Sequence, residues 1–324
     1  MKTAATTGAL VLASAGILFL SGLKPGTVPN LLVGNTTQVI LPILTPARTD
    51  VTIFAAGDML FDRKIRQMSE LYGSDHPFSC IEDLLRKADF AVANLEGPIT
   101  EHTSVSVGSV VGSSNNFVFT FPTTTATLLA RHNFKAVDIG NNHILNFGYT
   151  GLWSTQVSLG EAGVGYFGGV NGNEGIYETE INGVPLAFLG YNEFGGSSAQ
   201  EVAKLIQEES TDGRRVIVYT HWGDEYVDSS PRLRPIAKLF AQSGASAVIG
   251  SHPHVVLGSE YIGDTLVYYS LGNFIFDQFW DENVSTGLSL MLTVPKEGRI
   301  VAKEQPLQIM RDGRTCPKVQ EPTI

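Results

Sequence analysis

Cysteine is nearly absent from this sequence, since Cys80 and Cys316 are the only two among 324 residues. No Cys-x-x-Cys spacing occurs, which excludes a thiolate-rich zinc site and a thioredoxin-like redox motif. Outside the cytoplasm the two thiols could form a disulfide, although their separation in sequence says nothing about their distance in space. We interpret them as unpaired, partly buried thiols and keep a disulfide as the alternative.

Basic residues are also scarce, with 22 Lys and Arg against 32 Asp and Glu and a net charge of −10. A general nucleic-acid binder is excluded, because no basic stripe is available to neutralise phosphates. An anionic or phosphorylated substrate held by a metal remains compatible with this balance. The acidic charge otherwise keeps the protein soluble.

Charge is missing altogether between Lys2 and Lys24, and Ala9–Leu20 is almost wholly apolar. A transmembrane helix needs roughly 20 apolar residues and a signal-peptide core roughly 7–15, so Thr3–Leu23 fits either. No Ala-x-Ala site follows, which favours an uncleaved signal anchor over residues 1–23; a cleaved signal peptide or a buried helix is the alternative. We expect a protein of the cell membrane whose main domain lies outside the cytoplasm.

After a linker at residues 24–50, strand-like and helix-like segments alternate from Val51 onward, which predicts a layered α/β domain over residues 51–310. The polar tail at 311–324 is expected to pack poorly. The expected helices are Ile81–Lys87, Thr123–His132, Gly151–Ala162 with Thr150 as its cap, Ala199–Glu209 and Leu233–Gln242. Additional strands are expected at Leu186–Tyr191, Thr265–Ser270 and Gly287–Val294.

Two stretches interrupt this alternation. Thr103–Asn116 is rich in Ser, Val and Gly and is typical of a long exposed loop. Gly163–Gly175 is Gly-rich but lacks the Walker and Rossmann spacings, so we interpret it as a chain of turns and not as a phosphate-binding loop.

Five short apolar runs each end in residues that bind divalent metals. The runs are Val51–Ala56, Phe90–Ala93, Ala136–Gly140, Val216–Tyr219 and Ala247–Gly250. The motifs at their ends are Gly57-Asp58, Asn94-Leu95-Glu96, Asn141-Asn142-His143, Thr220-His221-Trp222-Gly223 and Ser251-His252-Pro253-His254. Because strand carboxyl ends share one edge of an α/β sheet, we expect the motifs to converge on one site.

Asp58 and Glu96 are the candidate carboxylate ligands, and Asn142 offers a neutral oxygen. Hard divalent cations prefer carboxylate oxygens, and Gly57 lets the chain turn tightly so that Asp58 points back over the strand end. Each residue also has an interpretation without metal: Asp58 as a helix or turn cap, Glu96 as an exposed turn residue, and Asn142 as part of an Asx turn.

The histidines supply the second ligand type. In an extended segment His252 and His254 share a face, so both imidazoles can reach one metal cluster. His221 alone is compatible with a hydrogen-bonded core histidine. His143 is a spare imidazole, placed for transition-state stabilisation or proton donation. We assign no role to His76, His102 and His132.

Two or three imidazoles, two carboxylates and an asparagine suit one or two divalent ions of manganese, zinc or iron, with a position left open for water. Such sites activate water and stabilise displacement at phosphorus.

The same motifs resemble those of the bacterial capsule-synthesis CapA proteins of poly-γ-glutamate biosynthesis. The resemblance covers residues 51–280 and includes a distinctive segment at Tyr269–Gln278. That family is similar to the calcineurin-like metallophosphoesterases, which implies a four-layer α-β-β-α sandwich. It also implies capsule synthesis or export at the membrane, with other capsule-synthesis proteins as expected partners.

The resemblance assigns individual roles. It implies metal ligands at Asp58, Glu96, Asn142, His221, His252 and His254, and a catalytic histidine at His143. Candidate substrate-binding residues are Arg63, Glu225 and Asn273. Two positions depart from the pattern: Leu60 stands where metallophosphoesterases carry a histidine, and Asn146 stands where CapA proteins usually carry an aspartate.

Three functional hypotheses follow. The first is a metal-dependent hydrolase that acts on a phosphoester or another anionic envelope substrate. The second is a non-catalytic component that binds an anionic polymer in a membrane assembly, as the substitution at Leu60 suggests. The third is an extracytoplasmic phosphatase unrelated to capsule.

Overall fold

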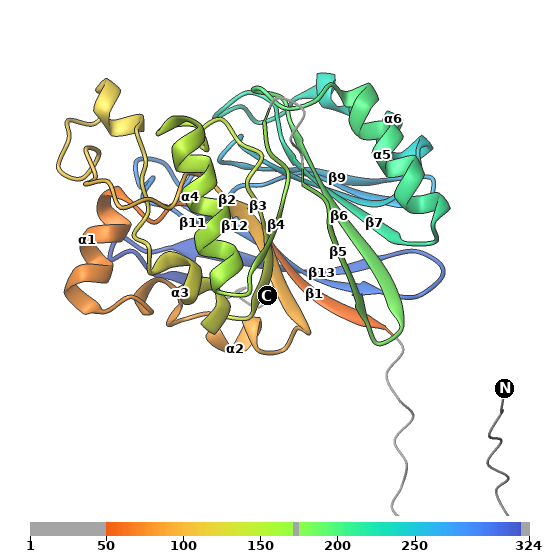
Figure 1. The fold of residues 1–324 in the computed structure, drawn as a ribbon, viewed down its shortest axis with the longest axis horizontal. Coiled ribbons are helices and arrows are strands. Elements are labelled where there is room, and N and C mark those ends of the chain that lie inside the picture. The colour runs from red at the N-terminus through yellow and green to blue at the C-terminus, as the bar shows by residue number, and fades with distance from the viewer. Residues whose placement is uncertain (1–49, 171–174, 319–324) are drawn as a thin grey trace, which may run out of the picture. The chain divides into compact units, whose positions relative to one another are not determined.

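The structure is a computed structural model that describes residues 50–170 and 175–318. These residues form two β-sheets with helices packed outside them, which confirms the expected α/β class (Figure 1). The predicted anchor and nearly all of the predicted linker lie outside the described residues. Among the residues that are described, no helix is both long enough and apolar enough to cross a membrane.

The first sheet has eight strands, in the order β14-β13-β12-β1-β2-β3-β4, with β11 paired to β1 off this path. Strands β1 to β4 run parallel, so their carboxyl ends lie along one edge, whereas β12 runs antiparallel to β1. The strands are β1 (Val51–Met59), β2 (Phe90–Leu95), β3 (Phe134–Asp138), β4 (Gly165–Phe167), β11 (Asn273–Ile275), β12 (Thr286–Val294), β13 (Val301–Ile309) and β14 (Thr315–Pro317).

The second sheet has six strands, in the order β5-β6-β7-β8-β10-β9. Strands β6, β7, β8 and β10 are parallel, with the antiparallel strands β5 and β9 at the two edges. The strands are β5 (Tyr177–Ile181), β6 (Val184–Asn192), β7 (Arg215–His221), β8 (Ala245–Ser251), β9 (Val256–Ile262) and β10 (Thr265–Leu271).

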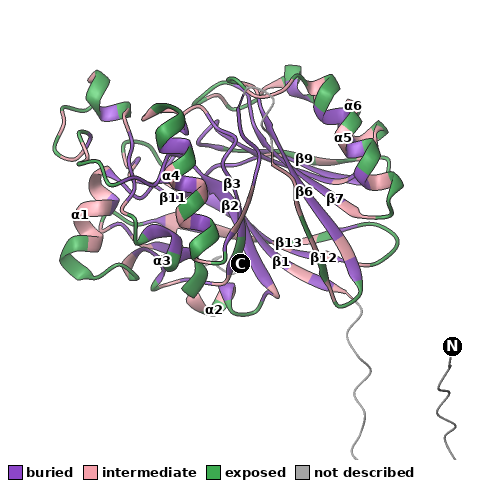
Figure 2. Ribbon diagram, in the orientation of Figure 1, coloured by how far each residue is buried: buried purple, intermediate pink, exposed green. Residues whose placement is uncertain are grey.

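Strand β1 shows why the sheets pack in layers. Side chains alternate across a strand, so Val51 and Ile53 point to one face and Phe54 and Ala56 to the other. The first pair lies in an apolar core shared with the second sheet, and the second pair lies in a core shared with helices. The strand is therefore buried along nearly its whole length (Figure 2), which explains why its sequence is mostly apolar instead of alternating.

Helices cover the outer face of each sheet. Those on the first sheet are α1 (Arg63–Tyr72), α2 (Glu82–Leu85), α3 (Thr125–Arg131) and α4 (Gly148–Glu161). Those on the second sheet are α5 (Ala199–Thr211) and α6 (Arg234–Gln242). Short 3-10 turns lie at η1 (His76–Phe78), η2 (Ser114–Phe117) and η3 (Pro231–Leu233). A capping box between Ser198 and Glu201 begins α5.

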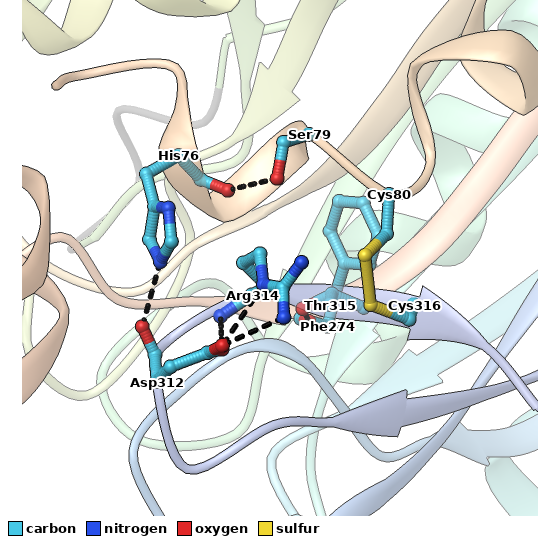
Figure 3. Close-up of a disulfide and its surroundings, with 8 residues drawn as sticks. All are labelled: His76, Ser79, Cys80, Phe274, Asp312, Arg314, Thr315 and Cys316. Atoms are coloured by element: carbon cyan, nitrogen blue, oxygen red, sulfur yellow. Dashed lines mark hydrogen bonds and ion pairs between the residues drawn. A yellow bond between two sulfur atoms is a disulfide. The ribbon is translucent and has the colours of Figure 1, made fainter. Parts of the chain in front are cut away.

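The two cysteines form a disulfide, which corrects our interpretation of unpaired thiols. Cys80 lies between η1 and α2, Cys316 lies in β14, and their Cα atoms are 4.8 Å apart (Figure 3). The expectation of a poorly packed tail is also wrong as far as Lys318, because β14 pairs with β13 and Thr315 is buried. The disulfide therefore fastens this last strand to the helical side of the first sheet.

Several predicted boundaries also needed correction. Four of the five strands that precede the motifs are longer than expected, so Asp58, Asn94 and His221 lie within strands and not after them. Strand β3 has the expected length but begins and ends two residues earlier than Ala136–Gly140. Helix α4 begins at Gly148, which places Thr150 inside the helix and not at its cap. Helix α1 was missed altogether, because its sequence is polar on average and follows the motif directly.

Candidate metal centre

Asp58 reaches the site because β1 crosses very close to the segment before β11. A Cβ atom on Gly57 would lie 1.8 Å from the carbonyl oxygen of Gly272, so only glycine fits there. The predicted reason for this glycine, a tight turn, is therefore wrong, since Gly57 is part of the strand. The backbone N–H of Asp58 donates to Gly272 O at 3.1 Å, which fixes the carboxylate at the sheet edge.

Strand β2 delivers Asn94 and Glu96 to the same edge. Asn94 is the register partner of Asp58, and its Nδ2 donates to Asp58 Oδ1 at 2.7 Å. Glu96 follows the strand end, where its backbone N–H donates to Met59 O at 3.0 Å. Both side chains are fully buried.

The turn after β3 is built by hydrogen bonds of short polar side chains. Asp138 Oδ1 accepts from the N–H of Gly140 at 2.9 Å, and Asn141 Oδ1 accepts from the N–H of His143 at 3.1 Å. Asn141 Nδ2 also donates to Asn94 Oδ1 at 3.1 Å and to Leu95 O at 2.8 Å. Asn141 therefore connects this turn to the end of β2.

The second sheet supplies three imidazoles. His221 ends β7, and His252 and His254 follow β8. We had expected the segment from His252 to His254 to be extended, and this expectation is wrong. His252 and His254 have φ angles of 90° and 58°, which are not those of extended backbone. Left-handed backbone is rare for residues other than glycine and is concentrated at functional sites. The two rings nevertheless lie close together, with centroids 6.1 Å apart.

Asp58, Glu96 and His254 form a buried cluster suited to a cation. Their ligand atoms all lie within 4.8 Å of one another. His254 Nδ1 is 3.5 Å from Asp58 Oδ2, and His254 Nε2 is 3.7 Å from Glu96 Oε1. Neither carboxylate oxygen of Glu96 has a hydrogen-bond partner although both are buried. A buried carboxylate without donors is strongly unfavourable, so the donor set fits a divalent cation.

Asn142, His221 and His252 form a second group beside the first. His221 Nε2 lies 2.9 Å from Asn142 Oδ1 and 3.1 Å from His252 Nδ1. Asp58 faces both groups, because its Oδ1 is 3.9 Å from His221 Nδ1 and its Oδ2 accepts from the N–H of His252 at 3.1 Å. An oxygen and two ring nitrogens converging in this way are borderline ligands, as zinc, iron and manganese accept.

Burial dominates the electrostatics of the cluster. It raises the pKa of Asp58 to about 6 and that of Glu96 well above its ordinary value. The nearby negative charge of Asp58 raises the pKa of Glu96 further. Burial also lowers the pKa of His254 to about 3 and that of His252 to about 4, and it lowers the pKa of His221 well below its ordinary value. Neutral imidazoles are the form that binds metals, and a cation would favour the ionised carboxylates.

His143 lies at the edge of the cluster. Its Nε2 is 3.9 Å from Glu96 Oε1, and its ring packs on Phe119 with centroids 4.2 Å apart. Its Nδ1 lies 3.2 Å from Asn146 Oδ1, and that oxygen also accepts the backbone N–H of Phe119 at 2.7 Å. Since a backbone N–H can only donate, the atom of Asn146 facing the ring is an acceptor, and Nδ1 carries the proton.

The candidate substrate residues lie in different surroundings. The Arg63 guanidinium pairs with Asp277 and packs over the rings of Phe119 and Phe276. Its positive charge acts on Glu96, His143 and His254. Glu225 is exposed. Asn273 is fully buried, and its Oδ1 lies 2.8 Å from His254 Nδ1, so it holds that ring in place.

Four residues to which the sequence assigned no role bond to site residues: Asn94, Asn141, Ser251 and Gln278. The position of Asn94 beside the site could have been predicted, because Asn94 lies two residues before Glu96 and side chains two residues apart in extended backbone share a face. The others depend on loop geometry that no spacing rule reveals. Leu60 is buried in the apolar core between the first sheet and its helices, so its position contributes no ligand.

Comparisons with known proteins agree with these motifs. A family model described as "Bacterial capsule synthesis protein PGA_cap" matches residues 52–278. The capsule biosynthesis protein CapA of Bacillus anthracis is 26% identical over 274 residues, which cover 78% of this chain and 66% of that protein. The PGA biosynthesis protein CapA of Bacillus subtilis (strain 168) is 27% identical over 252 residues, which cover 72% of this chain and 65% of that protein. The aligned part is therefore just under two thirds of each relative's length.

Proposed function

The chain belongs to the bacterial capsule synthesis protein PGA_cap family, and on that premise we propose that it hydrolyses a phosphoester of the cell envelope at a divalent metal centre. The process it serves would be capsule or poly-γ-glutamate synthesis or export, as the names of both CapA relatives suggest. The hydrolytic reaction is the part that the family name alone does not supply.

One observation carries the proposal: the two buried oxygens of Glu96 have no hydrogen-bond donor, and Asp58 and His254 lie beside them. A structural carboxylate in a core is normally hydrogen-bonded. Glu96 instead faces a second carboxylate, which raises its pKa further. This arrangement favours a cation that both carboxylates share.

Asp58, Glu96 and His254 would hold one ion, and Asn142, His221 and His252 would hold a second beside Asp58. Manganese, zinc and iron suit this mixed set of oxygen and nitrogen donors. When bound, such an ion supplies a Lewis acid that draws charge from a phosphoryl oxygen. The metallophosphoesterase-like character of the four layers is part of the same proposal.

The chain's own residues would orient the phosphoester and accept a proton during its hydrolysis. Because Asn146 fixes the proton of His143 on Nδ1, Nε2 is the atom that faces Glu96 and the reacting group. Burial lowers the pKa of His143 to about 4, so Nε2 is free to accept a proton at neutral pH. Arg63, held between Phe119 and Phe276, places positive charge beside the cluster.

The test is hydrolysis of bis-p-nitrophenyl phosphate by the full chain loaded with Mn²⁺, Zn²⁺ or Fe²⁺. The His143→Ala variant is expected to lose roughly 10²- to 10⁴-fold in kcat, the range typical of a general acid or base. His102→Ala is the matched control, because His102 is exposed and lies outside the site. No turnover with any of the three metals would contradict the proposal.

A non-catalytic role in binding an anionic polymer is the second candidate, and Leu60 favours it. Its side chain lies in the apolar core where metallophosphoesterases carry a metal ligand, so the centre has one ligand fewer. Capsule formation in cells carrying His143→Ala distinguishes the catalytic role from the polymer-binding role. Loss of capsule with a normally folded variant supports catalysis, whereas normal capsule supports the binding role.

A further inference from the structure

Three partly exposed aromatic rings lie around the buried cluster. Phe194 is 41% exposed, Tyr226 44% and Trp280 61%. The ring of Phe194 packs on His252 with centroids 4.2 Å apart, and the ring of Tyr226 stacks on His254 at 5.8 Å. Trp280 meets Tyr226 edge-on at 5.7 Å. His252 and His254 beneath them are each only 3% exposed, so the rings lie between these two imidazoles and solvent.

Tyr226 is held rigidly although it is partly exposed. Its hydroxyl accepts from Gln278 Nε2 at 3.0 Å, and Gln278 Oε1 accepts from Asn273 Nδ2 at 2.9 Å. Asn273 in turn bonds His254, so one chain of hydrogen bonds connects Tyr226 to the cluster. Its φ of 60° is left-handed, a conformation that persists only where the surroundings enforce it. A ring fixed in advance binds a ligand with little loss of entropy.

The charges beside these rings are mainly negative. The segments 193–197, 222–232 and 278–283 contain six acidic residues and one basic residue, Arg232. Two basic side chains reach these segments from elsewhere, Arg311 at Phe279 O and Lys318 at Glu282. Arg232 is already paired with Glu193 and Asp224. A polyanion lying over the rings would therefore meet net repulsion. A phosphoryl group would be better placed deeper, at the candidate cation site, and an uncharged group is better suited to the rings.

We propose that Phe194, Tyr226 and Trp280 form a binding subsite for the sugar ring of a glycosyl phosphate. A sugar ring presents C–H groups that pack on aromatic faces, and its hydroxyls donate to carboxylates such as Glu225. This inference rests on the proposed function, because the phosphoryl group must occupy the metal centre. It goes beyond that function by naming the group attached to the phosphate and by excluding the poly-γ-glutamate chain itself from this entrance.

The test compares affinities by calorimetry in the full-length chain carrying His143→Ala and loaded with Mn²⁺, so that ligands are not turned over. The probes are glucose 1-phosphate, glycerol 1-phosphate, adenosine 5′-monophosphate and a γ-linked glutamate oligomer. Glucose 1-phosphate is expected to bind about tenfold tighter than glycerol 1-phosphate, because a well-packed aromatic contact is worth somewhat more than 1 kcal/mol. Trp280→Ala, or Phe194→Ala as a second variant, is expected to remove most of this preference.

Trp153→Ala is the matched control, since Trp153 is 65% exposed on α4 and the preference should survive its removal. Any of three results would overturn the subsite. They are equal affinity for glucose 1-phosphate and glycerol 1-phosphate, tighter binding of adenosine 5′-monophosphate or the glutamate oligomer than of glucose 1-phosphate, and an unchanged preference in both ring variants. Hydrolysis by the wild-type chain is measured separately. Ring preference without hydrolysis would refute the proposed function alone, and hydrolysis without ring preference would refute the subsite alone.

Discussion

Asn94 donates a hydrogen bond of 2.7 Å to Asp58 Oδ1 across the register pair that joins β2 to β1. Asn141 Nδ2 donates to Asn94 Oδ1 at 3.1 Å, which settles the orientation of the Asn94 amide. Asn94 is fully buried and therefore cannot itself reach a substrate from solvent. Its function is to aim the Asp58 carboxylate.

Replacing Asn94 with Ala should weaken Mn²⁺ binding by roughly 10- to 100-fold, as loss of a residue that orients a metal ligand typically does. The reason is that Asp58 then loses the donor that fixes its Oδ1. Equilibrium dialysis with Mn²⁺ measures the effect. Asn115→Ala is the control, because Asn115 is exposed in η2. Unchanged affinity in a folded Asn94 variant would show that Asp58 needs no such support.

Much of the fold was predictable because each buried strand leaves a strong local signal. Each run before a motif overlaps a strand of the structure, although β3 lies two residues earlier than expected, because a strand buried on both faces is largely apolar. The edge strands β9 and β14, and β13 next to an edge, were missed. The side chains of β9 and β13 are only partly buried, so their sequences mix polar and apolar residues and give no strong strand signal. Strand β14 is only three residues long.

The grouping of three candidate ligands was predictable from the sequence, but their geometry was not. The motifs containing Asp58, Glu96 and His254 were selected by residue type, and the structure brings those residues together. The left-handed backbone at His252 and His254 was not foreseeable, because tertiary contacts impose it. The disulfide could not be predicted either, because the 236-residue separation of its cysteines in sequence does not reveal their distance in space.

Metal binding should stabilise the fold through Glu96. A ligand that binds only the folded state at a concentration of 100 times its Kd adds about 2.7 kcal/mol to the free energy of unfolding. We therefore expect Mn²⁺ to raise the melting temperature of the wild-type chain, and chelation to reverse the rise. In Glu96→Gln most of the rise should vanish, because the amide cannot supply the negative charge.

Differential scanning fluorimetry with and without Mn²⁺ measures this shift. Glu101→Gln is the control, since Glu101 is exposed and close in sequence to Glu96. An equal shift in Glu96→Gln and in the wild-type chain would exclude Glu96 as a ligand. No shift in the wild-type chain would argue against a metal centre formed by the folded protein.

The disulfide should stabilise the chain without affecting the metal centre. Replacing both Cys80 and Cys316 with Ser is expected to lower the free energy of unfolding by about 2–4 kcal/mol, the usual contribution of a native disulfide. Urea unfolding measures this loss, and Mn²⁺ affinity should stay unchanged in the folded variant. Dithiothreitol should destabilise the wild-type chain similarly and leave the double variant unaffected. A double variant as stable as the oxidised wild-type chain would contradict the prediction.

Asp138 should make the stability of the chain depend on pH. Its side chain is fully buried, its Oδ1 accepts from Gly140, and its Oδ2 has no hydrogen-bond partner. Burial raises the pKa of Asp138 well above its ordinary value of 3.8, and the nearby Asp58 raises it further. A carboxyl whose pKa is raised on folding holds its proton more tightly in the folded state. Its contribution to stability is therefore complete below pH 3.8 and is lost as the pH rises toward the folded pKa.

Asp138→Asn keeps the bond to Gly140 and removes the titrating group. The free energy of unfolding of this variant, relative to the wild-type chain, should rise by up to about 1.4 kcal/mol per pH unit above the unfolded pKa. Urea unfolding at several pH values between 5 and 8 measures this difference. Asp138→Ala loses the Gly140 bond as well, so it should be less stable than Asp138→Asn at every pH. A difference between Asp138→Asn and the wild-type chain that is constant with pH would mean that Asp138 is ionised in the folded protein and has a partner for Oδ2.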